Sequence, residues 1–351
     1  MIHHRIHRAR LLRGLSLEAL ANHLGDISKQ ALNKFEKGDS KPNSTRILQL
    51  AKALKVKPEY FFRSDAVQLA PLEFRKLSKM PQTRQASVRE KMHDHLERYE
   101  ALERCFEAET TVQVLPPQSL TVASVQEAEL AAQQLRDQLK IGGDAIAHLT
   151  ELLEANGIKV ALLDGPDDFD GACAATHDKQ HVLIALNCQR PGERMRFTAA
   201  HELGHWVMKL PHSMPDKHKE NCCHRFAGAF LYPKDRVLQD FGNHRRSRVY
   251  SAELLNAKRR YGVSMQVALR RLKDLDLLTE AGYRSAYFEF NKHGWRTNEP
   301  EALLPEQPRR FESLVYRGLA EDLFTPSRAA EFLQCRMDEL DPALDHLTLR
   351  V

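Results

Sequence analysis

Apolar residues recur at helical spacing through the first sixty positions, and capping residues divide them into short segments. One segment follows Ser16 and ends at Gly25, and its apolar face consists of Leu17, Leu20, Ala21 and Leu24. Serine before a helix and glycine after it supply hydrogen bonds or backbone conformations that helix ends need. The pattern therefore predicts a capped amphipathic helix.

Similar signals predict three more elements in this region. A helix is expected between Ser28 and Gly38, another after Pro42-Asn43-Ser44, and a last turn from Pro58 to the aromatic residues that end at Phe62. Two short helices joined by a turn that contains glycine have the arrangement of a helix-turn-helix. We assign residues 1–64 to this domain.

The rest of the chain has a different pattern. Residues 65–120 are rich in charge and glutamine, with helical periodicity at 84–109 and a Pro116-Pro117 break, which predicts a helical connector. A second domain is expected at 121–240, with helices at 125–140, 143–155, 193–210 and 219–231 and strands at 158–163 and 181–186.

The final region, 241–351, has patterns typical of helices and of one strand. Helices are predicted at 251–278 and 309–340, and aromatic alternation at 283–296 predicts a strand. The expected fold is thus mainly α with a small β component. It comprises a five-helix N-terminal helix-turn-helix domain, a helical connector, an α+β domain and a helical or mixed C-terminal region.

Composition and charge narrow the class of protein. No apolar run reaches the roughly 18 residues that cross a bilayer, the N-terminus lacks a signal-peptide pattern, and the six cysteines form no CxxC pair. A cytoplasmic protein with reduced thiols and no membrane partner is expected. Residues 1–64 hold 13 Lys and Arg against 5 Asp and Glu, a net charge of +8, which leaves −3 for the rest of the +5 chain. That asymmetry predicts a polyanionic partner for the N-terminal domain alone.

The second predicted helix carries residue types that contact DNA. Its polar side consists of Ser28, Lys29, Gln30, Asn33 and Lys34. Gln30 and Asn33 could pair with adenine, while Lys29 and Lys34 suit phosphates or guanine.

About 60 residues of this region resemble the XRE-type helix-turn-helix of phage repressors. The resemblance rests on the order of the helices, the loop FEKGDSKP and the closing aromatic turn. It implies binding to a double-stranded DNA operator, usually as a homodimer on a palindromic site.

A metal-binding pattern lies in the second domain. The segment RFTAAHELGHWVM contains His201-Glu202-Leu203-Gly204-His205. On a helix the two histidines share one face and can bind one zinc ion, and Glu202 beside them can act as general base on water. The apolar flanks predict a buried helix, and Gly204 is expected to leave space beside the metal.

A catalytic zinc ion needs a third protein ligand. Six downstream residues are candidates: His212, His218, Glu220, Cys222, Cys223 and His224. Spacing alone does not decide between Glu220 and His224.

The segments ERMRFTAAHELGHWV and ENCCHRFAGAFLYP resemble the ImmA/IrrE family of metallopeptidases, over about residues 125–235. The resemblance implies that Glu220, which opens the second helix, is the third zinc ligand. It also implies cleavage of a regulatory protein of the repressor or antitoxin type. The segment AKRRYGVSMQVALRRLKDLDLL resembles the helical region that follows this domain, with a second helix-turn-helix as the alternative.

Two functions other than proteolysis are open at this point. The chain could be a non-proteolytic repressor or antitoxin-like regulator whose zinc-site domain senses a signal or binds a partner. Alternatively, metal occupancy could itself change DNA affinity. The presence of Glu202 favours the enzyme, because a purely structural zinc ion has no need for that carboxylate.

Overall fold

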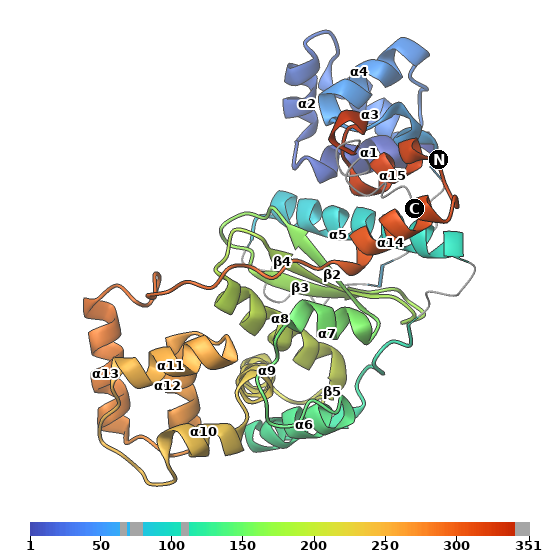
Figure 1. Ribbon diagram of the computed structural model, residues 1–351. Coiled ribbons are helices and arrows are strands. Elements are labelled where there is room, and N and C mark those ends of the chain that lie inside the picture. The colour runs from blue at the N-terminus through green and yellow to red at the C-terminus, as the bar shows by residue number, and fades with distance from the viewer. Residues whose placement is uncertain (64–68, 71–79, 107–111, 341–351) are drawn as a thin grey trace.

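A computed structural model describes residues 1–63, 69–70, 80–106 and 112–340. Figure 1 shows the N-terminal helices at one end, a small sheet with its covering helices in the centre, and a further helical region at the other end. The expected fold class, mainly α with a small β component, is confirmed.

The N-terminal domain consists of α1 (Ile2–Leu12), α2 (Leu17–Leu24), α3 (Lys29–Lys37), α4 (Ser44–Leu54) and a 3₁₀ helix (Pro58–Phe62). The side chains of Ser16, Ser28 and Asn43 accept hydrogen bonds from backbone N–H groups in the first turns of α2, α3 and α4. Gly25 and Gly38 follow α2 and α3 in the left-handed conformation. The predicted caps are therefore the ones that define the helix ends.

Replacement of Asn43 by alanine is expected to destabilise the N-terminal domain by about 1 kcal/mol. The Asn43 Oδ1 accepts from the Arg46 N–H at 2.8 Å, and alanine leaves that donor without its cap. Thermal denaturation of Asn43→Ala measures the loss. Ser44→Ala is the matched control, because Ser44 is the exposed first residue of α4 and makes no cap. Equal melting temperatures for wild type and Asn43→Ala would contradict the assignment.

Helix α5 (Gln82–Glu103) joins the N-terminal domain to the centre of the molecule. Its apolar face, with Val88, Met92 and Leu96, packs in one cluster with residues of the sheet. Its acidic face meets α1, where the buried Arg5 guanidinium donates to both oxygens of Glu97. The predicted connector helix is thus a packed layer of the structure, which a 3₁₀ turn at Arg104–Phe106 extends.

A mixed three-stranded sheet lies at the centre, in the order β2 (Ile158–Leu163), β4 (Val182–Asn187), β3 (Gly171–Ala175). β2 pairs parallel with β4, and β3 pairs antiparallel with β4 along the edge. The sequence predicts β2 and β4 but not β3. A second small sheet pairs β1 (Leu120–Thr121) with β5 (Met208–Lys209).

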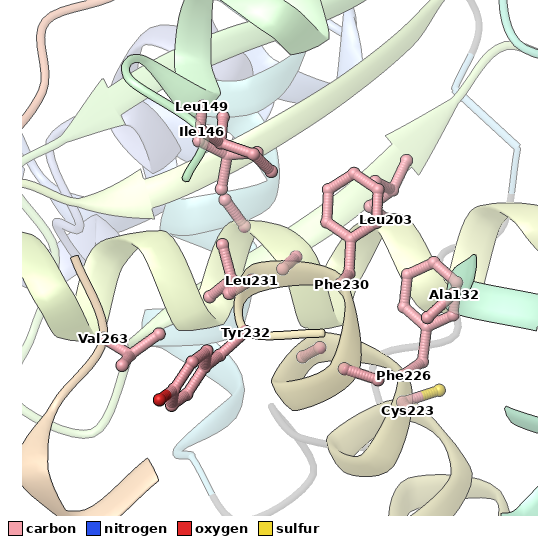
Figure 2. Packing of buried hydrophobic residues seen from close by; sticks show 14 of the residues in the cluster. Ala132, Ile146, Leu149, Leu203, Cys223, Phe226, Phe230, Leu231, Tyr232 and Val263 are labelled. Carbon is pink, nitrogen blue, oxygen red and sulfur yellow. The ribbon is translucent and has the colours of Figure 1, made fainter. Parts of the chain in front are cut away.

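Helices α6 (Val125–Gln138), α7 (Leu149–Ala155), α8 (Gly192–Val207) and α9 (Asp216–Leu231) complete the central core. Figure 2 shows Phe226 and Phe230 pointing from α9 toward Ala132 of α6 and Leu203 of α8. All four of these side chains are buried. This packing holds α8 and α9 side by side.

The C-terminal third is helical throughout its described elements. These are α10 (Lys234–Phe241), α11 (Ser251–Tyr261), α12 (Met265–Asp274), α13 (Glu280–Lys292), α14 (Arg310–Ala320) and α15 (Pro326–Leu333). The strand predicted at 283–296 is wrong, because α13 covers most of that segment. Figure 1 shows the chain returning across the molecule after α13, so that α14 and α15 lie against α5 and the N-terminal domain.

Candidate metal centre

Helix α8 carries the two histidines of the HELGH segment. They lie one turn apart and share a face, and their Nε2 atoms are 3.0 Å apart. His201 is only 1% exposed, whereas His205 is half-buried. Two imidazole nitrogens therefore converge at one point beside the central core.

Helix α9 brings a carboxylate to the same point. Glu220 has one oxygen 3.3 Å from His201 Nε2 and the other 3.3 Å from His205 Nε2. The residue lies in the second turn of α9, whose packing against α8 fixes its position. Two imidazole nitrogens and the two oxygens of one carboxylate, from two helices, thus form a compact group.

These three residues fit a zinc ion. Zinc bonds to histidine nitrogen and carboxylate oxygen of about 2.0–2.1 Å place tetrahedral ligand atoms about 3.3 Å apart. The observed separations of 3.0 and 3.3 Å agree with that edge length. Two imidazoles and one carboxylate are also a donor set that leaves one coordination position for water or substrate.

The charges of Glu220 and the two histidines are those of an ion pair. Burial raises the pKa of Glu220, but hydrogen bonds from His201 and His205 outweigh it and hold that pKa well below its usual range. Burial lowers the pKa of His205, but hydrogen bonds with Cys223 and Glu220 raise it to about 10. A cation that binds here must displace the histidine proton, so its affinity falls as the pH is lowered.

Two other side chains of α9 lie beside the histidines. The Cys223 sulfur lies within 4.8 Å of a ring nitrogen of His201 and of His205. The His224 ring packs 4.6 Å from the His201 ring, centroid to centroid, and its nitrogen belongs to a group with His201 and Glu220. Glu220 is favoured over His224 as the third metal ligand, because one of its oxygens contacts His201 and the other contacts His205.

The remaining sequence candidates lie elsewhere. His212 and His218 are exposed and belong to neither group of metal-binding residues found in the described part of the chain. Cys222 is buried on α9 outside those groups. Free cysteines are confirmed for all six positions.

Glu202 lies in the same buried stretch of α8 and is 5% exposed. Burial and the nearby Glu202 charge together raise the pKa of the Cys173 thiol on strand β3. The same charge is one of those that raise the pKa of His205. The Glu202 charge is therefore near both His205 and Cys173 of β3.

Gly204 has a packing role that differs from the space beside the metal expected from the sequence. A Cβ added at this position would lie 3.0 Å from the Phe226 ring of α9. The absence of a side chain lets α8 approach α9 closely, which is the approach that brings Glu220 to the histidines.

In the N-terminal domain, the residues predicted to contact DNA lie along α3 and at its start. Ser28, Lys29, Gln30 and Lys34 are exposed, and Asn33 is half-buried. The Ser28 hydroxyl also accepts from the Ala31 N–H and so caps the helix. Helix α3 presents its polar side to solvent and its Leu32 to the domain core.

Comparison with known families gives two matches. A family described as Helix-turn-helix matches residues 6–61, and a peptidase family described as IrrE N-terminal-like domain matches residues 154–273. The second match spans β2 to α12 and includes every residue of the candidate metal centre. No curated protein matches the chain. Among the described helices, none has the length and apolar character that crossing a bilayer requires.

Proposed function

We propose that this chain, which joins an XRE-type helix-turn-helix domain to an IrrE N-terminal-like domain, is a DNA-binding transcription regulator that also cleaves a regulatory protein with zinc. The observation that carries the peptidase part is the convergence of His201, His205 and Glu220 beside the buried Glu202. A purely structural metal site needs only its ligands, so the buried Glu202 carboxylate beside them supports a catalytic site.

Each residue has a role in peptide hydrolysis. His201, His205 and Glu220 would hold the zinc ion. Zinc, when bound, would supply a Lewis acid that lowers the pKa of water, so that the water loses a proton more readily and becomes a better nucleophile. Glu202 accepts the proton of that water at its carboxylate. As the water oxygen bonds to the carbonyl carbon and the C–N bond breaks, Glu202 returns the proton to the departing amine.

The substrate would bind as an extended segment along β3. Among the strands of the described part of the chain, this one lies at the edge of the sheet, and α8 packs against it. An extended peptide can add to such an edge through main-chain hydrogen bonds. The positions from Gly171 to Ala174 are the suitable ones, because Ala175 and Thr176 already pair with Ala70 and Leu69. The resemblance to ImmA/IrrE proteins favours a repressor or antitoxin as the substrate.

Identification of new protein N-termini tests the peptidase directly. Zinc-loaded chain is incubated with a lysate of the organism that produces it, with either 1,10-phenanthroline or the non-chelating 1,7-isomer added. Proteolysis predicts new N-termini with the 1,7-isomer that disappear with the 1,10-isomer. Identical N-terminal profiles under both conditions would leave the DNA-binding role and remove the enzymatic one.

For DNA, two kinds of effect are expected from α3. Lys29→Gln and Lys34→Gln should weaken binding to all DNA sequences. Each should also reduce the slope of log binding constant against log salt concentration by about one, the value for one lost phosphate contact. Gln30→Ala and Asn33→Ala should cost about 1–3 kcal/mol on the preferred sequence only. The two classes separate because phosphate contacts carry no sequence information.

Fluorescence anisotropy with an operator selected from random DNA measures these effects. We further propose that the chain binds DNA as a dimer, which predicts a palindromic selected sequence with half-sites one helical turn apart. Lys234→Gln is the control, because Lys234 is an exposed lysine on α10 in the other domain. Equal losses for Lys234→Gln and Lys29→Gln would show that net charge, and not α3, determines affinity.

A further inference from the structure

A cavity lies where the N-terminal domain meets the rest of the molecule. Its volume is about 500 Å³, within the range of small-molecule sites. Its walls come from the ends of α1 and α4, the 3₁₀ helix at Pro58–Phe62, one face of α5, the end of β2, and α15. Figure 1 shows α15 beside α1 and above α5, at this junction.

The charged side chains around the cavity are mostly cationic. Six basic residues face three acidic ones, which gives a net charge of +3: Arg13, Lys55, Lys57, Arg63, Lys91 and Arg98 against Asp94, Asp164 and Glu331. Two of the cations are already neutralised, since Arg63 pairs with Glu331 and Arg98 pairs with Asp94.

The other four cations have no carboxylate partner among the described residues. Arg13 donates to the main-chain oxygens of Leu54 and Lys55, and Lys91 donates to the main-chain oxygen of Asp164. Lys55 and Lys57 are exposed at the rim. Positive charge gathered in a partly enclosed space attracts small anions, because low-dielectric walls concentrate its field.

The walls also contain buried polar atoms that have no hydrogen-bond partner in the described part of the chain. These are Tyr60 Oη, Arg63 Nε, Asp94 Oδ1 and His95 Nε2. Tyr60 and Asp94 are each 3% exposed. Buried polar groups are normally paired, so this cluster marks the surroundings of the cavity as polar rather than apolar.

We propose that this cavity is the binding site of a small anion, of the phosphate-ester or carboxylate class. Its anionic group would lie near Lys55, Lys57 and Arg13. No residue of the candidate metal centre lines this cavity.

The position of the cavity gives the ligand a regulatory role. Since its walls come from the DNA-binding domain on one side and from α5, β2 and α15 on the other, a bound anion bridges the two parts. It stabilises the orientation that binds it best and shifts the population toward that orientation. The effect on DNA affinity rests on the proposed function, whereas anion binding itself does not.

Isothermal titration calorimetry of the zinc-loaded full-length chain at low ionic strength tests the site, with ribose 5-phosphate and citrate as probes. Lys55→Gln/Lys57→Gln is expected to weaken binding about tenfold or more, because charge-assisted hydrogen bonds are the strong ones. Lys41→Gln/Lys52→Gln is the matched control. It removes the same charge from exposed lysines of the same domain that do not line the cavity, and it should bind as wild type does.

Binding of ribose 5-phosphate alone assigns the site to phosphate esters, and binding of citrate alone assigns it to carboxylates. Lack of binding of both probes to wild type, or an equal loss in the two double variants, overturns the proposal. A repeat of the DNA anisotropy with the bound probe tests the regulatory role. An unchanged DNA affinity would refute that role, while a wild-type chain that binds no DNA would count against the proposed function and leave the calorimetric result intact.

Discussion

Replacement of His201 or Glu220 by alanine is expected to abolish zinc binding. Wild type should retain about one zinc ion per chain, as a catalytic site with three protein ligands does. Both variants remove one of the ligand atoms that lie 3.0–3.3 Å apart in the group. Elemental analysis of the purified proteins gives the stoichiometry, and circular dichroism establishes that the variants are folded.

Two further variants distinguish this site from its alternatives. His218→Ala should keep the zinc ion, because His218 is exposed on α9 and lies outside the group. His224→Ala should retain zinc at wild-type stoichiometry, since its ring packs beside His201 and Glu220 supplies the third ligand. Zinc retained by Glu220→Ala but lost by His224→Ala would reverse the assignment of the third ligand.

Replacement of Glu202 by glutamine should lower the rate of proteolysis by about a hundredfold to ten thousandfold, the contribution typical of a general base. Glutamine has nearly the same shape but cannot accept the proton of the attacking water. The zinc content should stay at the wild-type value, because Glu202 is not one of the proposed ligands. The rate is measured on a peptide that spans a cleavage site found by N-terminal identification.

Glu151→Gln is a suitable control, because Glu151 is an exposed carboxylate of α7 within the same domain. It should cleave at the wild-type rate. A Glu202→Gln variant with full zinc and full activity would show that another group takes the proton. A Glu202→Gln variant without zinc would instead indicate a role in metal binding.

Some elements could be predicted from the sequence because their signals are local. The caps Ser16, Ser28 and Asn43 lie within three residues of the N–H groups that they accept from. The spacing of His201 and His205 is fixed by the helical turn itself. For such features, a few neighbouring residues contain all the necessary information.

Other predictions failed because the local pattern was ambiguous or too weak. In the segment predicted as a strand, Tyr283 and Tyr287 are four residues apart, and their rings stack on one face of α13 at 6.0 Å. The alternation of aromatic residues in the same segment fits a strand, whereas the spacing of these two tyrosines fits a helix. Strand β3 was missed because Gly171–Ala175 contains small residues without β-branched side chains, and its pairing with β4 is what stabilises it.

By itself, the sequence determined the helix-turn-helix elements with their caps, the helix that carries His201, Glu202 and His205, and the separation of charge between the two parts of the chain. Tertiary structure alone brought Glu220 to both histidines, packed α5 against the N-terminal domain through Arg5 and Glu97, and formed the cationic cavity at their junction. The physical reason is sequence separation. Spacing along one helix fixes which residues share its face, but the packing of whole helices and strands decides which faces meet.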